Sequence, residues 1–240
     1  MSIPPERSPA VSRPRAPAAS GSGEGRSRVV AVVLACVLLI VLLGIGVFVG
    51  FAPLLRLDTA VSRDLYAGDH RSAALDALLQ VVTAPGLTLV RLVVAAPVLV
   101  LLARRKAWWT GAWVLVTVAL IGPLTTLCKD LVGRPRPQFA HGGAHLQSLS
   151  FPSGHSSGIA TAVTVGLVLA WPLFSARARR ISLAVGLALV VVVGFSRMWL
   201  GLHYLSDVVA GWSLGVAWAM LTALLFGALP GGRAALRPRQ

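Results

Sequence analysis

The sequence predicts an all-α, polytopic membrane protein built as a bundle of six transmembrane helices. Two observations carry this prediction. Apolar residues make up 56% of the 240 residues and charged residues only 12%, which is too apolar for an ordinary soluble domain. Six segments are also long and apolar enough to span a bilayer, which takes about 20 residues of helix. They are 29–50, 81–103, 107–128, 156–174, 181–200 and 205–226.

The first apolar segment marks where the folded part of the chain is expected to begin. Its apolar run is longer than the roughly 7–15 residues of a secretory signal peptide, and no small-residue cleavage site follows it, so we expect a retained helix. Residues 1–28 are rich in Pro, Ser, Ala, Gly and Arg and lack a periodic apolar face, which predicts a disordered basic tail. A second short, disordered basic tail is expected at 230–240. One helical domain, 29–229, lies between them.

The net charge of +14 is explained by membrane topology. Fourteen of the 22 lysines and arginines fall in four clusters on one side of a six-helix arrangement: 7–28, 104–106, 177–180 and 233–239. Basic residues accumulate in cytoplasmic loops, so both termini are predicted to be cytoplasmic. The protein is expected in the plasma (inner) membrane. Because topology accounts for the charge, no nucleic-acid partner is expected.

Three short polar blocks interrupt the apolar pattern at helix ends. They read KDLVGRPRP (Lys129–Pro137), PSGH (Pro152–His155) and SRMWLGLHYLSD (Ser196–Asp207). The topology puts all three on the extracytoplasmic side, although it rests on unrelated Lys and Arg positions. Each block begins or ends within a turn or two of a span. A shared site would therefore lie at headgroup level and suit a lipid with a phosphorylated headgroup.

The blocks resemble the three signature motifs of the type 2 phosphatidic acid phosphatase (PAP2) superfamily, K-x6-R-P, P-S-G-H and S-R-x5-H-x3-D. The resemblance covers about residues 55–226, and the six-helix layout resembles the membrane branch of the family. It implies that His203 is a nucleophile that forms a phosphohistidine and that Asp207 orients its imidazole. Every fixed motif position is filled, by Lys129, Arg136–Pro137, Pro152–His155, Ser196–Arg197, His203 and Asp207.

The histidines and the aspartate also suit this chemistry by their spacing. His203 and Asp207 lie four residues apart and share a face of a helix turn. A carboxylate there can accept a hydrogen bond from one imidazole nitrogen and leave the other free to attack phosphorus. Taken alone, the pair could equally cap a helix. His155 is expected to protonate the leaving oxygen and then to accept a proton from water; its alternative role is to satisfy backbone groups at the start of the fourth span.

Five further residues are candidates for binding the phosphoryl group. Lys129, Arg136 and Arg197 supply positive charge for its oxygens, and such a set can stabilise phosphoryl transfer without a divalent ion. Ser153 and Gly154 form a tight turn before a helix, whose free N–H groups favour an anion. No metal and no cofactor are predicted. Singly, each cation could instead contact the phosphates of membrane lipids.

Two other arginines do not match a motif position. Arg134 is expected to contact lipid phosphates at the interface. Arg91 lies well inside the second span, where a charge is costly and usually faces a partner or a polar cavity. Asp76 and Asp130 are the candidate partners, and pairing of this kind is favoured over contact with substrate.

Two segments on the outer side have weaker signals. Residues 138–149 are expected to form a polar lid or a cap that faces the substrate. The mixed-charge residues 56–76 are expected to include an interfacial helix, because Leu57, Val61 and Leu65 recur at four-residue steps. Their expected role is a solvated surface or a side wall for lipid entry.

Together these features predict a metal-independent enzyme that hydrolyses a lipid phosphate or diphosphate at the extracytoplasmic face, with membrane lipids as its partners. Undecaprenyl diphosphate is the first candidate substrate, and phosphatidate or phosphatidylglycerol phosphate is the alternative, because the motifs recognise phosphate and not the lipid tail. A different class is a lipid transporter or a non-enzymatic protein that binds anionic lipids. Internal repeats would favour a transporter, and none is convincing. The motifs do not specify the oligomeric state.

Overall fold

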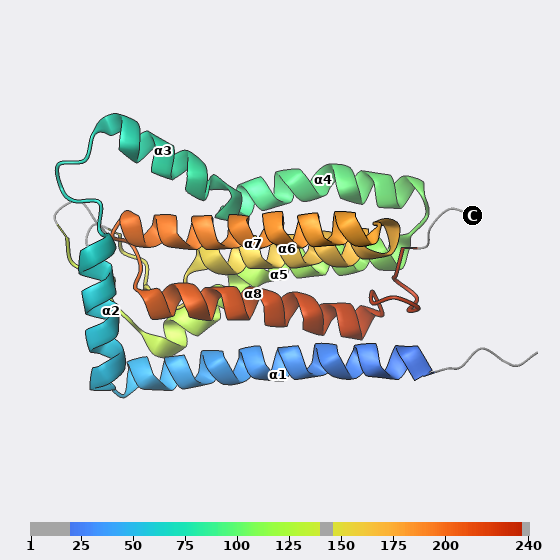
Figure 1. The fold of residues 1–240 in the computed structure, drawn as a ribbon, viewed down its shortest axis with the longest axis horizontal. Coiled ribbons are helices and arrows are strands. Elements are labelled where there is room, and N and C mark those ends of the chain that lie inside the picture. The colour runs from blue at the N-terminus through green and yellow to red at the C-terminus, as the bar shows by residue number, and fades with distance from the viewer. Residues whose placement is uncertain (1–19, 140–145, 237–240) are drawn as a thin grey trace, which may run out of the picture.

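The computed structural model describes residues 20–139 and 146–236, and all regular structure in these residues is helical. The long helices run side by side, and one helix, α2, lies across an end of the bundle that we call the α2 end (Figure 1). The elements are α1 (Ser20–Phe48), α2 (Ala52–Leu65), α3 (Ala73–Thr83), a 3₁₀ turn η1 (Ala84–Gly86), α4 (Thr88–Arg104), α5 (Trp108–Val132), α6 (Gly154–Ala170), a 3₁₀ turn η3 (Trp171–Leu173), α7 (Ala176–Trp199) and α8 (Leu205–Phe226).

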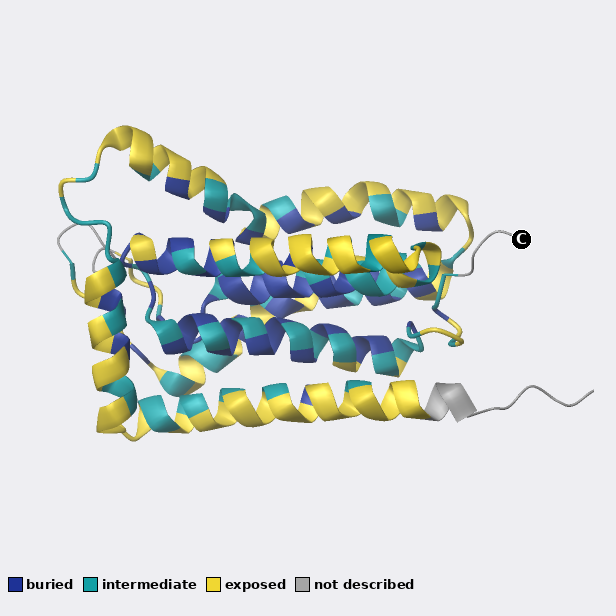
Figure 2. Cartoon of the chain, in the orientation of Figure 1, coloured by how far each residue is buried: buried dark blue, intermediate teal, exposed yellow. Residues whose placement is uncertain are grey.

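The protein is an integral membrane protein, as the composition predicts. Within the described residues, α1, α5, α6, α7 and α8 are each long and apolar enough to cross a bilayer, and α3 with α4 makes a sixth crossing if the pair counts as one span. The outer faces of α1 and α7 expose many valines and leucines (Figure 2). Such a surface is expected to face lipid, because lipid tails are as apolar as these side chains.

The second span is not the continuous helix that we expected over 81–103. The chain bends by 49° between α3 and α4, and the break is the turn η1, with sequence Ala84–Pro85–Gly86. Proline has no N–H to donate to a helix, which favours a break here. Gly86 lets the backbone approach α6 closely, because a Cβ atom at this position would lie 2.8 Å from both Cβ and the carbonyl oxygen of His155. The break therefore brings η1 against the start of α6.

Among the described residues, α6 and α8 make the most extensive contact between two helices. Gly211 and Gly215 lie one turn apart on α8 and face the first turns of α6. A Cβ atom at Gly211 would lie 2.6 Å from the carbonyl oxygen of Ser153, and one at Gly215 would overlap the carbonyl oxygen of Ser157. Small residues at such spacing let two membrane helices approach closely. This contact fixes where α6 and α8 begin relative to each other.

The opposite end of the bundle is closed by a separate core around Trp113, which is fully buried. Trp113 Nε1 donates to Thr222 Oγ1 (3.2 Å), and Thr117 and Thr222 share a hydroxyl–hydroxyl bond (2.8 Å). The chain after α8 also returns to this core. Thr110 Oγ1 donates to the carbonyl oxygen of Ala234 (2.8 Å), and Ala234 is buried.

Both expected tails are therefore shorter than the sequence suggested. Residues 230–236 are packed onto the bundle and not disordered, because Ala234 is buried and the Arg233 guanidinium stacks over the Trp109 ring at 3.9 Å. At the other terminus, α1 begins at Ser20. The ion pair between Glu24 and Arg28, four residues apart, extends the helix beyond the apolar segment. The rest of both tails, 1–19 and 237–240, lies outside the described residues.

Helix α2 corresponds to the interfacial helix expected in 56–76, and it begins with Pro53 in its first turn. It differs from the expectation in the face that it buries. Asp58 and Ser62 are buried, whereas Leu57 is 52% exposed. The buried carboxylate points to polar partners inside the bundle, so this part of α2 is not a solvated surface.

Adding a methyl group at either glycine of the α6–α8 contact should destabilise the protein. We expect Gly211→Ala and Gly215→Ala each to lower the free energy of unfolding by about 1–3 kcal/mol, because the overlap must be relieved by moving a backbone. Gly166→Ala on α6 is the matched control, since a Cβ atom there meets nothing within 4 Å. Thermal unfolding in detergent measures the difference, and equal midpoints for all three variants would contradict the packing argument.

Candidate functional site

The three motif blocks meet at the α2 end of the bundle. The C-terminal turns of α5 and α7 and the first turns of α6 and α8 all lie at this end (Figure 1). Their polar residues are brought together by direct contacts between blocks: Arg136 with His203, and Ser153 with Asp207. The basic clusters 104–106 and 177–180 lie at the opposite end, the first where α4 ends and the chain connects to α5, the second in the first turns of α7.

The centre of the site is the pair His203 and Asp207, both buried. Nδ1 of His203 lies 3.5 Å from Oδ2 of Asp207. Nε2 lies 3.2 Å from Nη1 of Arg136. A guanidinium can only donate, so Nε2 must accept and the ring proton belongs on Nδ1, facing the carboxylate. The geometry therefore leaves the Nε2 lone pair directed away from Asp207 and toward a cation.

Burial also keeps the His203 imidazole neutral. It lowers the pKa of His203 from its ordinary value of 6.5 to about 3, against the opposing effect of Asp207 and with a smaller contribution from the positive charge of Arg136. A neutral ring is the form that carries a nucleophilic lone pair. Burial and charge together thus favour the reactive form at neutral pH.

Asp207 is fixed from several directions. Its Oδ2 accepts from the backbone N–H of Tyr204 (2.9 Å) and from the hydroxyl of Ser150, and its Oδ1 accepts from Nη1 of Arg134 (2.7 Å). The bond to Tyr204 also caps the first turn of α8. The Asp207 carboxylate therefore both caps α8 and lies beside the His203 imidazole.

Arg134 is not an interfacial contact for lipid phosphates, as we expected, but the centre of a buried ion-pair network. Its Nη2 donates to Oδ2 of Asp58 on α2 (2.7 Å), and its Nη1 donates to both Asp207 and the Ser206 hydroxyl (2.7 Å each). Its guanidinium also stacks over the ring of Tyr204 at 4.0 Å. The expectation failed because the partner, Asp58, is 76 residues away in the chain.

Arg136 and Lys129 line the site but already donate to backbone carbonyls. Nε of Arg136 donates to the carbonyl oxygen of Ser148 (2.8 Å), and its Nη1 donates to that of Leu202 (2.7 Å). Nζ of Lys129 donates to the carbonyl oxygens of Leu149 and Ser150. Burial lowers the pKa of Arg136, with Asp207 opposing the effect. Backbone carbonyls of the segment before α6 thus already accept hydrogen bonds from these two cations. The expected lid, 138–149, lies partly outside the described residues, at 140–145.

Arg197 contributes the third predicted cation and is only 6% exposed. Its Nη1 donates to Oγ1 of Thr83 (3.2 Å), and no partner for its Nε occurs in the described part of the chain. Thr83 precedes the η1 break, so the broken span contacts both Arg197 and His155. Ser196, the first residue of the third motif block, donates to the carbonyl oxygen of Val193 in its own helix (2.7 Å).

The PSGH block forms the start of α6. The Ser153 N–H donates to the carbonyl oxygen of Asp207 (2.9 Å), and the Ser153 hydroxyl caps α6 by accepting from the N–H of Ser156. The N–H groups of Gly154 and His155 precede the first bond within the helix, and no acceptor for them occurs among the described residues. Free N–H groups at a helix N-terminus attract an anion.

A cavity of about 780 Å³ opens beside this helix start. His155 and Gly154 of the α6 start line it together with Lys129 and Arg91, and other residues of η1, α4 and α5 complete the lining. Within residues 20–139 and 146–236, no group of three or more His, Cys, Asp or Glu side chains forms a candidate metal site.

The family comparison agrees with this geometry. The model of the PAP2 superfamily matches residues 110–229, which is half of the chain and includes every motif residue from Lys129 to Asp207. The chain belongs to the PAP2 superfamily. The resemblance of its three motif blocks is thereby confirmed.

Relatives in the PAP2 superfamily include named phosphatases. The lipid A 1-phosphatase of Rhizobium johnstonii is 36% identical over 138 residues, which is 52% of this chain and 53% of the relative. Phosphatidylglycerophosphatase B of Bacillus subtilis is 36% identical over 115 residues, 47% of this chain and 55% of the relative. The chain spans about half the length of the curated relatives it matches.

A solved PAP2 structure has the same architecture. It is described as the first transmembrane PAP2 type phosphatidylglycerolphosphate phosphatase from Bacillus subtilis. The two folds match with a TM-score of 0.63 and 25% sequence identity, over 80% of this chain and 94% of that chain. The all-α membrane bundle predicted from the sequence is therefore confirmed.

The sequence motifs missed several residues that complete this PAP2 site. Arg134 and Asp58 stabilise Asp207 from behind, Ser150 contacts both Asp207 and His203, and Thr83 contacts Arg197. Arg134 lies between two motif residues, but this position did not distinguish a buried cation from an interfacial one. The others carry no local signal, because each is a common residue type whose partner comes from a distant segment.

Removing the Arg134 guanidinium should destabilise the PAP2 fold strongly. We expect Arg134→Met to cost about 3–5 kcal/mol of unfolding free energy, because it leaves two buried carboxylates without their cation. Adding Asp58→Asn should recover part of the loss. Arg56→Met, at an exposed position on α2, is the matched control. Denaturation in detergent tests this, and equal stability of Arg134→Met and the control would refute the network's role.

The low pKa of His203 predicts a pH dependence of stability. Between pH 6.5 and about 3 the unfolded chain binds a proton at His203 that the folded chain does not, so folding loses stability as the pH falls through this window. We expect the unfolding midpoint of His203→Gln to fall less between pH 7 and pH 4 than that of the wild type. His70→Gln, at an exposed position, serves as control. Parallel pH profiles for wild type and His203→Gln would count against a buried neutral imidazole.

Proposed function

We propose that this protein hydrolyses a phosphate or diphosphate group of a membrane lipid through a covalent phosphohistidine on His203. One observation carries the proposal. The imidazole is buried and neutral, its Nδ1 faces Asp207, and its Nε2 faces the cationic side of the site. This is the arrangement that a nitrogen nucleophile needs. The names of the PAP2 relatives support a phosphatase.

In the first step, Nε2 of His203 attacks phosphorus, and the bond between phosphorus and the leaving oxygen breaks. His155 donates a proton to that oxygen, which leaves as an alcohol or, from a diphosphate, as a lipid monophosphate. In the second step His155 accepts a proton from water, the water oxygen attacks phosphorus, and the P–Nε2 bond breaks to release phosphate. One imidazole serves both proton transfers.

The developing charge on the phosphoryl oxygens is stabilised by Lys129, Arg136 and Arg197 together with the free N–H groups at Gly154 and His155. Positioning and charge stabilisation supply most of the catalysis in phosphoryl transfer. These groups can do so without a divalent ion, so we propose that the reaction is metal-independent. Ser153 has a supporting role, because its hydroxyl caps α6 and its N–H donates to Asp207.

We propose that the site faces the extracytoplasmic side and that both termini are cytoplasmic. The basic clusters lie at the end of the bundle away from the site, and such clusters stay in the cytoplasm. This orientation suits a substrate that reaches the outer leaflet of the plasma membrane.

Candidate substrates differ in what joins the attacked phosphate to the lipid. Undecaprenyl diphosphate is our first candidate. Phosphatidylglycerol phosphate is the alternative that the names of a curated relative and of the similar solved structure support, and phosphatidate is a third. The named activity of the Rhizobium relative adds the 1-phosphate of lipid A to the lipids worth assaying.

Phosphate release from these lipids in detergent, with EDTA present, tests the proposal. We expect His203→Ala to lower kcat by at least about a thousandfold, and His155→Ala by about 10²–10⁴-fold. His70→Ala, an exposed histidine on the same side of the bundle, is the matched control and should retain wild-type activity.

Two outcomes would reject this mechanism. Full activity of folded His203→Ala would exclude the nucleophile, and loss of wild-type activity in EDTA would exclude a metal-independent reaction. A good leaving group adds a direct check: with p-nitrophenyl phosphate, His155→Ala should accumulate acid-labile phosphohistidine, because only the second step then needs the histidine. Release from no lipid by well-folded protein would favour a non-enzymatic lipid-binding protein or transporter.

A further inference from the structure

Arg91 is a buried cation for which the proposed mechanism has no use. It lies on the first turn of α4, just past the η1 break, and is 4% exposed. Neither Asp76 nor Asp130, the partners we expected, pairs with it: Asp76 pairs with Arg71, and no ion pair to Arg91 occurs within residues 20–139 and 146–236. A charge at membrane depth without a counter-ion is costly and marks a functional position.

The contacts of Arg91 leave part of its guanidinium unsatisfied. Its Nη1 donates to the carbonyl oxygen of Gly86 (2.9 Å), and its Nη2 donates to Oγ1 of Thr88 (3.2 Å). Its Nε is buried and has no partner among the described residues. Both acceptors are neutral, so the positive charge is not compensated. An anionic ligand would compensate it.

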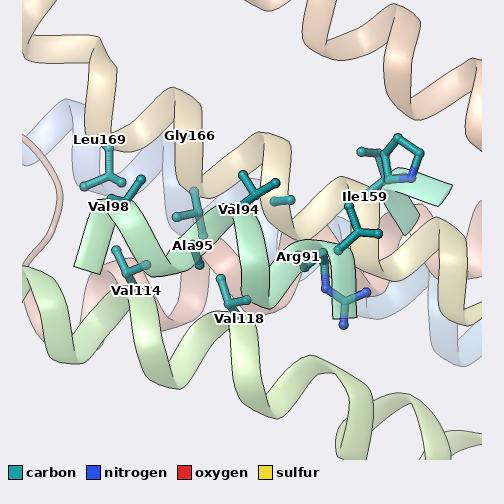
Figure 3. Close-up of a pocket in the computed structure, with 13 residues that line it drawn as sticks. Arg91, Val94, Ala95, Val98, Val114, Val118, Ile159, Gly166 and Leu169 are labelled. Carbon is teal, nitrogen blue, oxygen red and sulfur yellow. The ribbon is translucent and has the colours of Figure 1, made fainter. Parts of the chain in front are cut away.

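Arg91 lines both the cavity beside the start of α6 and a second, apolar cavity. It lines the 780 Å³ cavity together with Lys129 and His155. It also lines a cavity of about 210 Å³ between α4, α5 and α6, whose other walls are almost entirely apolar. Figure 3 shows Arg91 at one end of this second cavity, with Val94, Val98 and Leu169 further along it.

The depth of Arg91 relative to His155 is set by α6. The guanidinium lies against Gly158, where a Cβ atom would overlap Nη1. Gly158 follows His155 by three residues, which is roughly 4.5 Å along the helix axis. Arg91 is therefore about one helical turn deeper in the bundle than the residue that serves the attacked phosphate.

We propose that Arg91 binds a second phosphoryl group of the lipid substrate, one that lies between the attacked phosphate and the lipid tail. This inference rests on the proposed function and names its substrate class. The order of groups along the path matches such a lipid: Lys129 and His155 at the attacked phosphate, Arg91 at the second phosphoryl group, and the apolar cavity for the start of the tail. A diphosphate and a phosphate joined through glycerol to a phosphodiester both have this order, whereas phosphatidate does not.

Kinetics on matched lipids test this assignment. For Arg91→Gln we expect KM to rise about tenfold or more for undecaprenyl diphosphate, phosphatidylglycerol phosphate or both, because a charge-assisted contact is lost. KM for phosphatidate should change by less than about twofold. Arg91→Lys should lie between the wild type and Arg91→Gln. A rise for one of the two lipids alone identifies whether a diphosphate or a glycerol-linked phosphodiester is the source.

Two controls separate binding from a structural role. Thr88→Val removes a hydrogen bond of Arg91 but keeps its charge, and Arg105→Gln removes a charge from the far end of the same helix. Both should leave the KM ratio between the lipids unchanged. A similar loss on phosphatidate and on the two-phosphate lipids in Arg91→Gln, or the same pattern in Thr88→Val, would overturn the proposal in favour of a scaffold for η1.

A binding measurement without turnover distinguishes failure of this inference from failure of the proposed function. Phosphatidylglycerol carries only the second, retained phosphoryl group, and it can be titrated into His203→Ala protein. Adding Arg91→Gln should weaken its binding about tenfold, while binding of diacylglycerol stays the same. Equal binding by both proteins of phosphatidylglycerol and also of undecaprenyl phosphate, which carries the retained phosphoryl group of the diphosphate, would overturn the assignment of Arg91 whatever the activity of the wild type.

Discussion

The pairing of Arg134 with Asp58 and Asp207 is the interaction on which the rest of the site depends. It joins three segments: the crossing helix α2, the loop after α5 and the first turn of α8. All three charges are buried, and buried charges are tolerated only when paired and hydrogen-bonded. Asp207 uses one oxygen for Arg134 and the other beside His203, so the network sets the direction of the imidazole. Groups that do not contact the ligand therefore hold the Asp207 and His203 side chains in position.

The second constraint on the site is the close approach of its helices, which glycines and not large apolar side chains make possible. Glycines on α8 let α6 start directly beside Asp207, and Gly86 lets the broken second span touch His155. The break costs the continuity of a membrane span but brings Thr83 to Arg197 and leaves Arg91 lining a cavity. Irregular backbone at membrane depth is tolerated where protein buries it or where it lines a cavity. The η1 turn meets both conditions.

The sequence was most informative where partners are close in the chain or share a motif. Hydropathy predicted the membrane bundle, and the blocks containing Lys129, Arg136, His155, His203 and Asp207 were predicted to meet and do so. The sequence could not predict the Arg134–Asp58 pair, because neither residue type nor spacing distinguishes a buried partner from an interfacial charge. The break at η1 was not predicted either: Pro85 favours it, but the apolar run continues past this residue, and only the structure shows that the break lets Gly86 approach α6. The packing of residues 230–236 was not predicted for a similar reason, because the burial of one small residue, Ala234, leaves no sign in the composition.

The hydrogen bonds of Lys129 and Arg136 to the carbonyls of Ser148, Leu149 and Ser150 have a consequence for the proposed reaction. The segment before α6 acts as an internal competitor for the phosphoryl group, because an arriving anion must take these donors from the backbone. A weakly charged anion gains too little interaction free energy to displace these carbonyls, so it binds weakly. After hydrolysis the same carbonyls can take the donors back, and this lowers the affinity for the departing phosphate. These backbone carbonyls thus favour release of the product.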